Sequence, residues 1–139
     1  MIVQAMTTSF KREILQAVHN LDTDVFKIAL YTTNANIDAS TTVYTSAGES
    51  TGTGYTAGGL TLANLGVTAS GTVAYASWSD ATWTGLVTQC AGALIYNTSK
   101  GNKAVAVLNF GGTYTTNAAT PFTVAFPNNS STTAIVIIN

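Results

Sequence analysis

The chain has 139 residues, of which 46% are hydrophobic and only 8% are charged, and its formal net charge is −1. Intrinsic disorder requires few hydrophobic residues and many charges, so this composition excludes a disordered chain. The near-zero charge gives no attraction to nucleic acid, and no apolar run approaches the length of a membrane span. We therefore expect a single domain, residues 1–139, large enough to bury a core and without nucleic-acid or membrane partners.

The amino-terminal part of the chain predicts the only helix. The first residues, Met1–Met6, lack the basic residues and long apolar stretch of a signal peptide, which favours a soluble protein made in a cytoplasm. Over about residues 9–21 the apolar residues Phe10, Ile14 and Val18 recur on one helical face. This spacing predicts a short amphipathic helix.

After the helix, short apolar runs alternate with polar turns. The expected strands cover residues 25–31, 60–62, 72–78, 88–96, 103–110, 122–126 and 134–138. The polar link 97–102 is typical of a hairpin connection, and the stretch 46–59, rich in Gly, Thr and Ser, predicts a long loop. We therefore expect a mainly β fold, a jelly-roll-like antiparallel β-sandwich over about residues 25–138 with one short N-terminal α-helix.

The sequence offers little for catalysis. His19 is the only histidine, and no serine lies in a G-x-S-x-G context that would pair with it. We interpret His19 as a structural or incidental residue at the surface or at the helix end. Cys90 lies in an apolar run with no second histidine to activate it, so we expect it to fill the core. These observations predict a protein that is not an enzyme.

Cofactor and metal sites are equally poorly supported. Asp22 and Asp24 lack the glycine and the terminal glutamate of a calcium-binding loop, although a calcium ion that bridges loops stays an open alternative. One cysteine and one histidine do not form a zinc site. The stretch 52–59 has neither a following lysine nor a following helix to hold a phosphate. We expect no cofactor and no metal.

Three aromatic residues are the candidate interface residues, namely Tyr55 in the long loop, Trp78 and Trp83. Exposed Trp and Tyr side chains stack on sugar rings or anchor protein interfaces. The other interpretation places Trp78 in the core and Trp83 over one edge of the sandwich, because aromatic residues dominate cores as well. The second interpretation is favoured for the tryptophans.

Several segments resemble, in order along nearly the whole chain, a family of small structural proteins of tailed-bacteriophage virions. They are residues 9–15, 18–19, 26–32, 49–59, 92–97, 102–111 and 122–127. Some small β proteins of such particles are cement, or decoration, proteins on the capsid, with jelly-roll folds that associate as oligomers. The resemblance therefore implies a virion protein that binds the capsid.

Two functions follow from the resemblance and the aromatic residues. The first is a capsid cement protein, made in the host bacterial cytoplasm and located on the capsid surface. It would bind the major capsid protein, bridge its subunits and form a homo-oligomer, a dimer or trimer. The second is a receptor- or glycan-binding module of the tail, with Trp78, Trp83 and neighbouring tyrosines as its platform.

Overall fold

The computed structural model describes residues 1–139. The helix α1 spans Thr8–Leu15, and one 3-10 turn, η1, spans Thr98–Lys100. The strands are β1 (Ala5–Met6), β2 (Phe26–Tyr31), β3 (Leu60–Thr61), β4 (Asn64–Ser70), β5 (Val73–Trp78), β6 (Ala81–Trp83), β7 (Gln89–Asn97), β8 (Lys103–Thr115), β9 (Phe122–Val124) and β10 (Val136–Ile138). No helix has the length and the apolar composition that crossing a membrane requires.

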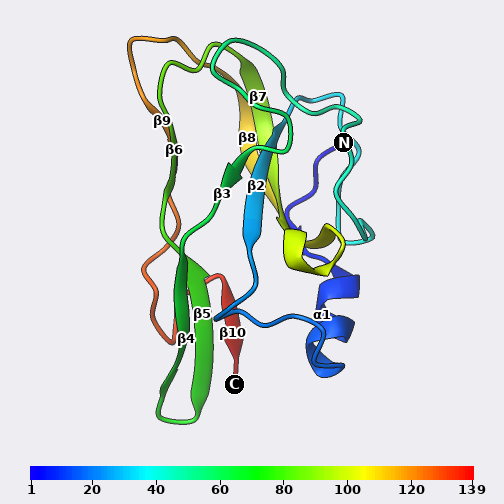
Figure 1. The fold of residues 1–139 in the computed structure, drawn as a ribbon, viewed down its shortest axis with the longest axis vertical. Coiled ribbons are helices and arrows are strands. Elements are labelled where there is room, and N and C mark those ends of the chain that lie inside the picture. The colour runs from blue at the N-terminus through cyan, green and yellow to red at the C-terminus, as the bar shows by residue number, and fades with distance from the viewer.

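The strands form three antiparallel sheets. A five-stranded sheet has the order β1-β8-β7-β2-β3, a three-stranded sheet the order β10-β5-β4, and β6 pairs with β9. Figure 1 shows β6 and β9 on one side of the five-stranded sheet, and the first, cyan part of the long segment between β2 and β3 on the other. These sheets and the one short helix confirm the predicted mainly β class, while the jelly-roll topology stays a prediction.

The centre of the five-stranded sheet is buried on both faces. Phe26 and Ile28 of β2 point into one core cluster, which includes residues of β5, β6, β9 and β10. Ala29 and Tyr31, the alternate residues, point into a second cluster, which the amino terminus and residues 35–44 cover. A strand buried on both faces has a continuous apolar run instead of an alternating one, and this explains the sequence of β2.

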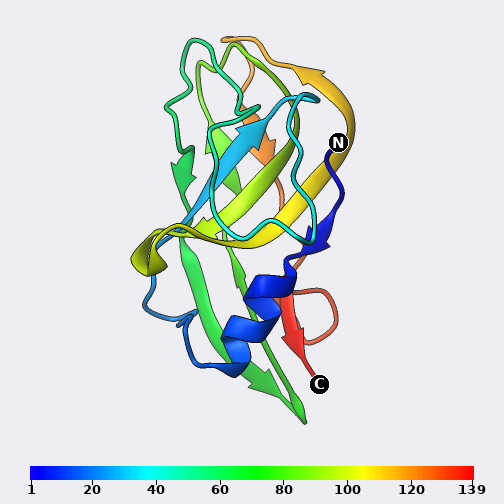
Figure 2. The same ribbon diagram turned by 90° about the vertical axis from the view of Figure 1, so that its right-hand side faces the viewer.

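The helix is shorter than the sequence predicts. Thr7 caps it by accepting a hydrogen bond from the Phe10 amide, but α1 ends at Leu15 instead of continuing to residue 21. Ala17 has a φ of 56°, a left-handed conformation that no helix interior contains, and the chain turns there. Figure 2 shows α1 beside the lower end of the molecule, near the carboxyl terminus. The apolar pattern beyond Leu15 therefore belongs to a turn that packs on the core.

Each predicted strand has a counterpart in the structure. The predicted hairpin link 97–102 joins β7 to β8 through η1, and Gly101 and Asn102 adopt φ values of 65° and 59°. Strand β8 continues to Thr115, beyond the predicted end at residue 110. A bulge accompanies this extension, because Cys90 pairs with Tyr114 whereas Gly92 pairs with Asn109. The extra residues change the direction in which the side chains at the outer end of β8 point.

Candidate functional site

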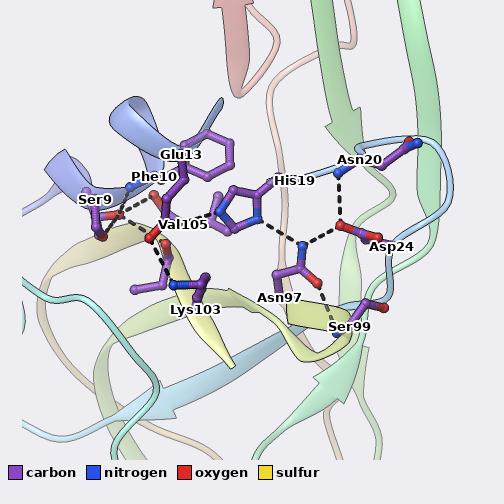
Figure 3. Close-up of polar contacts among 12 residues, drawn as sticks. Ser9, Phe10, Glu13, His19, Asn20, Asp24, Asn97, Ser99, Lys103 and Val105 are labelled. Atoms are coloured by element: carbon purple, nitrogen blue, oxygen red, sulfur yellow. Dashed lines mark hydrogen bonds and ion pairs between the residues drawn. The ribbon is translucent and has the colours of Figure 1, made fainter. Parts of the chain in front are cut away.

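A buried polar cluster joins α1, the turn after it and the β7–β8 hairpin (Figure 3). The side chain of His19 is completely buried, and its Nε2 lies 2.7 Å from Oε2 of Glu13. The other carboxylate oxygen of Glu13 accepts a hydrogen bond from Nζ of Lys103, at 3.2 Å. The cluster therefore links the helix to strand β8 through a histidine and a carboxylate.

Asn97 completes the cluster and sets the protonation of the ring. Its Nδ2 donates to Oδ2 of Asp24 at 2.8 Å, and its Oδ1 accepts from the Ser99 amide at 3.0 Å. A carboxylate only accepts and a backbone N–H only donates, so these two contacts fix which way the amide points. Nδ2 therefore also donates to Nδ1 of His19, at 2.9 Å. In this arrangement Nδ1 accepts from Asn97, and Nε2 carries the proton that is directed at Glu13.

Both carboxylates of the cluster are held in the ionised form. Burial alone would raise the pKa of Glu13, but the hydrogen bonds from His19 and Lys103 outweigh it and lower the pKa below its usual value. The pKa of Asp24 is lowered in the same way, because hydrogen bonds from the Asn20 amide and from Asn97 outweigh the effect of burial. The cluster is thus a set of compensated buried charges.

The arrangement has no free group for acid–base chemistry. Each ring nitrogen of His19 already has a partner, Glu13 on one side and Asn97 on the other. The hydroxyl of Ser9 is directed to Thr7 and to the Thr41 carbonyl, and makes no hydrogen bond to His19. The expectation of a surface or helix-end histidine is wrong, since the early end of α1 folds His19 back under the helix. The structural role expected of it agrees with these contacts.

A third carboxylate, Glu49, fixes the long glycine-rich loop. Oε1 of Glu49 accepts hydrogen bonds from the hydroxyl of Tyr55, at 2.7 Å, and from the Gly58 amide, at 2.6 Å, and Oε2 accepts from the hydroxyl of Tyr44. The Tyr96 hydroxyl donates to the Gly58 carbonyl. Burial, reinforced by the Glu49 charge, raises the pKa of Tyr96 to about 12 and also raises the pKa values of Tyr44 and Tyr55. The predicted loop is thus held by side chains.

The structure places the three candidate interface residues, Tyr55, Trp78 and Trp83, in different environments. Tyr55 is partly buried, and its hydroxyl also accepts a hydrogen bond from the Leu30 amide. This side chain therefore holds the loop against strand β2. Trp78 and Trp83 are only 2% and 3% exposed and pack in the first core cluster. This burial corrects the expectation of an exposed aromatic interface at Trp78 and Trp83, and agrees with their interpretation as core residues.

A different set of aromatic residues reaches the surface. Phe110, Tyr114 and Phe122 form a triad whose ring centroids lie 6.1–6.4 Å apart, and Tyr114 is 51% exposed. They line a groove of about 410 Å³ between β8 and the segment that begins with β9. Its twelve lining residues are Gln4, Leu108, Asn109, Phe110, Tyr114, Phe122, Thr123, Val124, Ala125, Phe126, Pro127 and Ile135.

The groove is uncharged and mostly apolar, which is typical of a binding surface. None of its lining residues is charged, and no charged residue occurs anywhere between Ala104 and Asn139. The signal in the sequence that could have found it is the group of aromatic residues at 110, 114 and 122 beside two prolines. Their grouping depends on the bulge in β8, which has no clear sequence signature.

The remaining chemical candidates are inert or absent. Cys90 is fully buried, as expected of a core residue, and burial raises the pKa of its thiol to about 11. Nowhere do three His, Cys, Asp or Glu side chains gather so that they could hold a metal ion. Searches for similarity to known protein families, to curated proteins and to solved structures find no significant match.

Proposed function

We propose that the chain is a structural protein of a tailed-phage particle, a capsid cement protein on the outer shell. It binds the major capsid protein and bridges neighbouring subunits, which adds interface area across seams of the shell. The observation that carries the proposal is the uncharged aromatic groove between β8 and β9, where Tyr114 is half exposed. Aromatic residues are enriched at protein interfaces, and charged residues are depleted at their centres.

The charge distribution supports a binding role over turnover of a polar substrate. The two carboxylate clusters, around Glu13 and around Glu49, use their oxygens within the fold. The groove, in contrast, contains no acid, base or nucleophile beyond the Tyr114 phenol. The groove therefore offers a binding surface and no set of groups of the kind that acid–base or nucleophilic catalysis uses. The sequence resemblance to small virion proteins supplies the identity of the partner in this proposal.

The tail-adhesion alternative lacks the exposed tryptophans on which it was based. It required Trp78 and Trp83 at the surface, and both indoles are in the core. Stacking on a sugar would have to use the groove triad instead, where three rings pack edge to face or tilted against one another. Such packing leaves less open ring face than a flat platform does.

The test compares particles of the encoding phage with and without the chain. The gene is deleted, purified protein is added back to half of the preparation, and both halves are heated while released genome is detected with a DNA dye. We expect genome release at a higher temperature when the chain is bound, because a bridged seam opposes internal pressure. Equal release temperatures contradict the cement role. Immunogold labelling over the whole head supports it, whereas labelling confined to the tail supports adhesion.

A further inference from the structure

The groove is bounded by two strand edges. Side chains alternate between the faces of a strand, so a strand that presents a face to a groove lines it with every second residue. Here the run Phe122–Pro127 lines the groove without interruption, and so does Leu108–Phe110. In β9 itself the three consecutive residues Phe122–Val124 line the groove, so the backbone of this strand borders it as well as its side chains. Ala125–Pro127 continue as irregular chain, and the Phe126 amide donates to Oδ1 of Asp80.

The edge of β9 is open. β9 pairs with β6 alone, in a two-stranded sheet, so its other edge has no strand beside it. On the opposite wall, β1 pairs with β8 only at Val107 and Ala106. Beyond that point β8 bulges and has no outer strand, and its Asn109 amide donates to Oε1 of Gln4. An edge of this kind presents backbone N–H and C=O groups that an added strand can pair with.

The absence of charged residues in the groove limits the kind of segment that can bind there. A charged side chain that entered would lose its hydration, and none of the twelve lining residues carries an opposite charge to compensate. The electrostatic complement of this surface is therefore an uncharged segment. The triad of Phe110, Tyr114 and Phe122 matches apolar side chains, which a bound strand directs to one side at every second position.

We propose that the groove binds an extended, uncharged segment of the partner subunit, added as a strand along the open edge of β9. Its alternate apolar side chains pack on the aromatic triad. The identity of that partner as the shell subunit rests on the proposed function, whereas the strand-binding chemistry rests on the groove alone. Tyr114 contributes most exposed aromatic surface and is the expected anchor.

The test titrates the full-length, ¹⁵N-labelled chain with a capped nine-residue peptide of alternating threonine and valine. A matched peptide has lysine in place of each valine, and a second has proline in place of the central residue, which removes one backbone donor. We expect amide shifts confined to about residues 108–127 for the first peptide and much weaker binding of the other two. No shifts at millimolar peptide, or equal binding of the lysine peptide, overturns the proposal.

Two variants test whether the peptide binds through the groove. Tyr114→Ser is expected to weaken peptide binding about tenfold, in line with a modest hot spot. Leu15→Ser removes an apolar side chain that is 88% exposed on α1, away from the groove residues, and is expected to leave binding unchanged. Equal effects of the two variants overturn the proposal. So does sedimentation that shows a dimer in the native chain and a monomer in Tyr114→Ser, because a second copy would then occupy the groove.

The peptide titration and the particle experiment can fail independently of each other. If the chain binds particles but no peptide, the groove proposal fails and the cement role stands. If the peptide binds and particles do not, strand addition stands and the shell partner is rejected.

Discussion

Nδ2 of Asn97 lies 2.9 Å from Nδ1 of His19 and 2.8 Å from Oδ2 of Asp24, so one amide group bridges an imidazole and a carboxylate. Asn97 is the last residue of β7 and is completely buried. Through it the strand is tied to the turn that follows α1 (Figure 3). The helix and the sheet are therefore coupled by a polar contact as well as by the packing of Phe10.

Replacing Asn97 with alanine is expected to destabilise the fold strongly. The change leaves one nitrogen of His19 without a partner in a buried site, removes one of the two hydrogen bonds that Oδ2 of Asp24 accepts, and frees the Ser99 amide in an exposed turn. Each orphaned buried group costs about 1–3 kcal/mol, so we expect a loss of about 3 kcal/mol in the free energy of unfolding, measured in urea. The control is Asn36→Ala, an exposed asparagine, for which we expect a change within about 0.5 kcal/mol. Similar losses in both variants would contradict the bridging role.

Much of the β architecture follows from the sequence because its signals are local. The apolar run of β2 and the link that begins at Asn97 each predict their element directly. The sequence does not predict strand β4, because most of its side chains are exposed and Gly66 interrupts the apolar pattern. Likewise β1 and β6 are two and three residues long, too short for a periodic pattern. Such strands form only because a longer neighbour offers an edge.

The candidate sites depend on contacts distant in sequence. Asn97 lies 78 residues from His19, and Lys103 lies 90 residues from Glu13, so no spacing rule connects them. The groove requires a bulge in β8 that brings Tyr114 toward Phe122. The sequence identified aromatic residues as important but gave no way to tell the buried tryptophans from the exposed triad. Burial is decided by tertiary packing, which a single sequence does not display.

Stability is expected to fall in acid because of Glu13 and Asp24. Their pKa values are lowered in the folded state from ordinary values of 4.5 and 3.8, so the unfolded chain binds more protons. The stabilisation is complete above those ordinary values and is lost as the pH falls through the lower pKa values of the folded state. Urea unfolding at a series of pH values measures the slope. Asp24→Asn is expected to flatten the curve in this range, and an unchanged slope in this variant would exclude Asp24 as a source.

Replacing Glu49 with glutamine is expected to loosen the loop of residues 46–59. An amide nitrogen in place of Oε1 faces the Gly58 N–H as a second donor, and one in place of Oε2 forces the Tyr44 hydroxyl to turn and accept. In either case the remaining hydrogen bonds lose their charge. We expect a loss of about 2 kcal/mol and faster hydrogen exchange at the Gly58 amide. Ser46→Ala, an exposed change in the same loop, is the control and should alter neither quantity. Unchanged exchange at Gly58 in Glu49→Gln would contradict the role of Glu49 in holding this loop.

Two glycines with similar backbone conformations separate steric overlap from backbone strain. Gly59 and Gly71 have φ values of 76° and 61°, so alanine is strained at both positions. A Cβ at Gly59 would also overlap the carbonyl oxygen of Ile28, at the point where β3 joins β2, whereas a Cβ at Gly71 meets nothing within 4 Å. We expect Gly71→Ala to cost about 1 kcal/mol, from strain alone. Gly59→Ala is expected to cost more than about 3 kcal/mol, because the β2–β3 pairing must open. Urea unfolding of the two variants measures the difference, and equal losses would show that the close approach of Gly59 to β2 is not required by the fold.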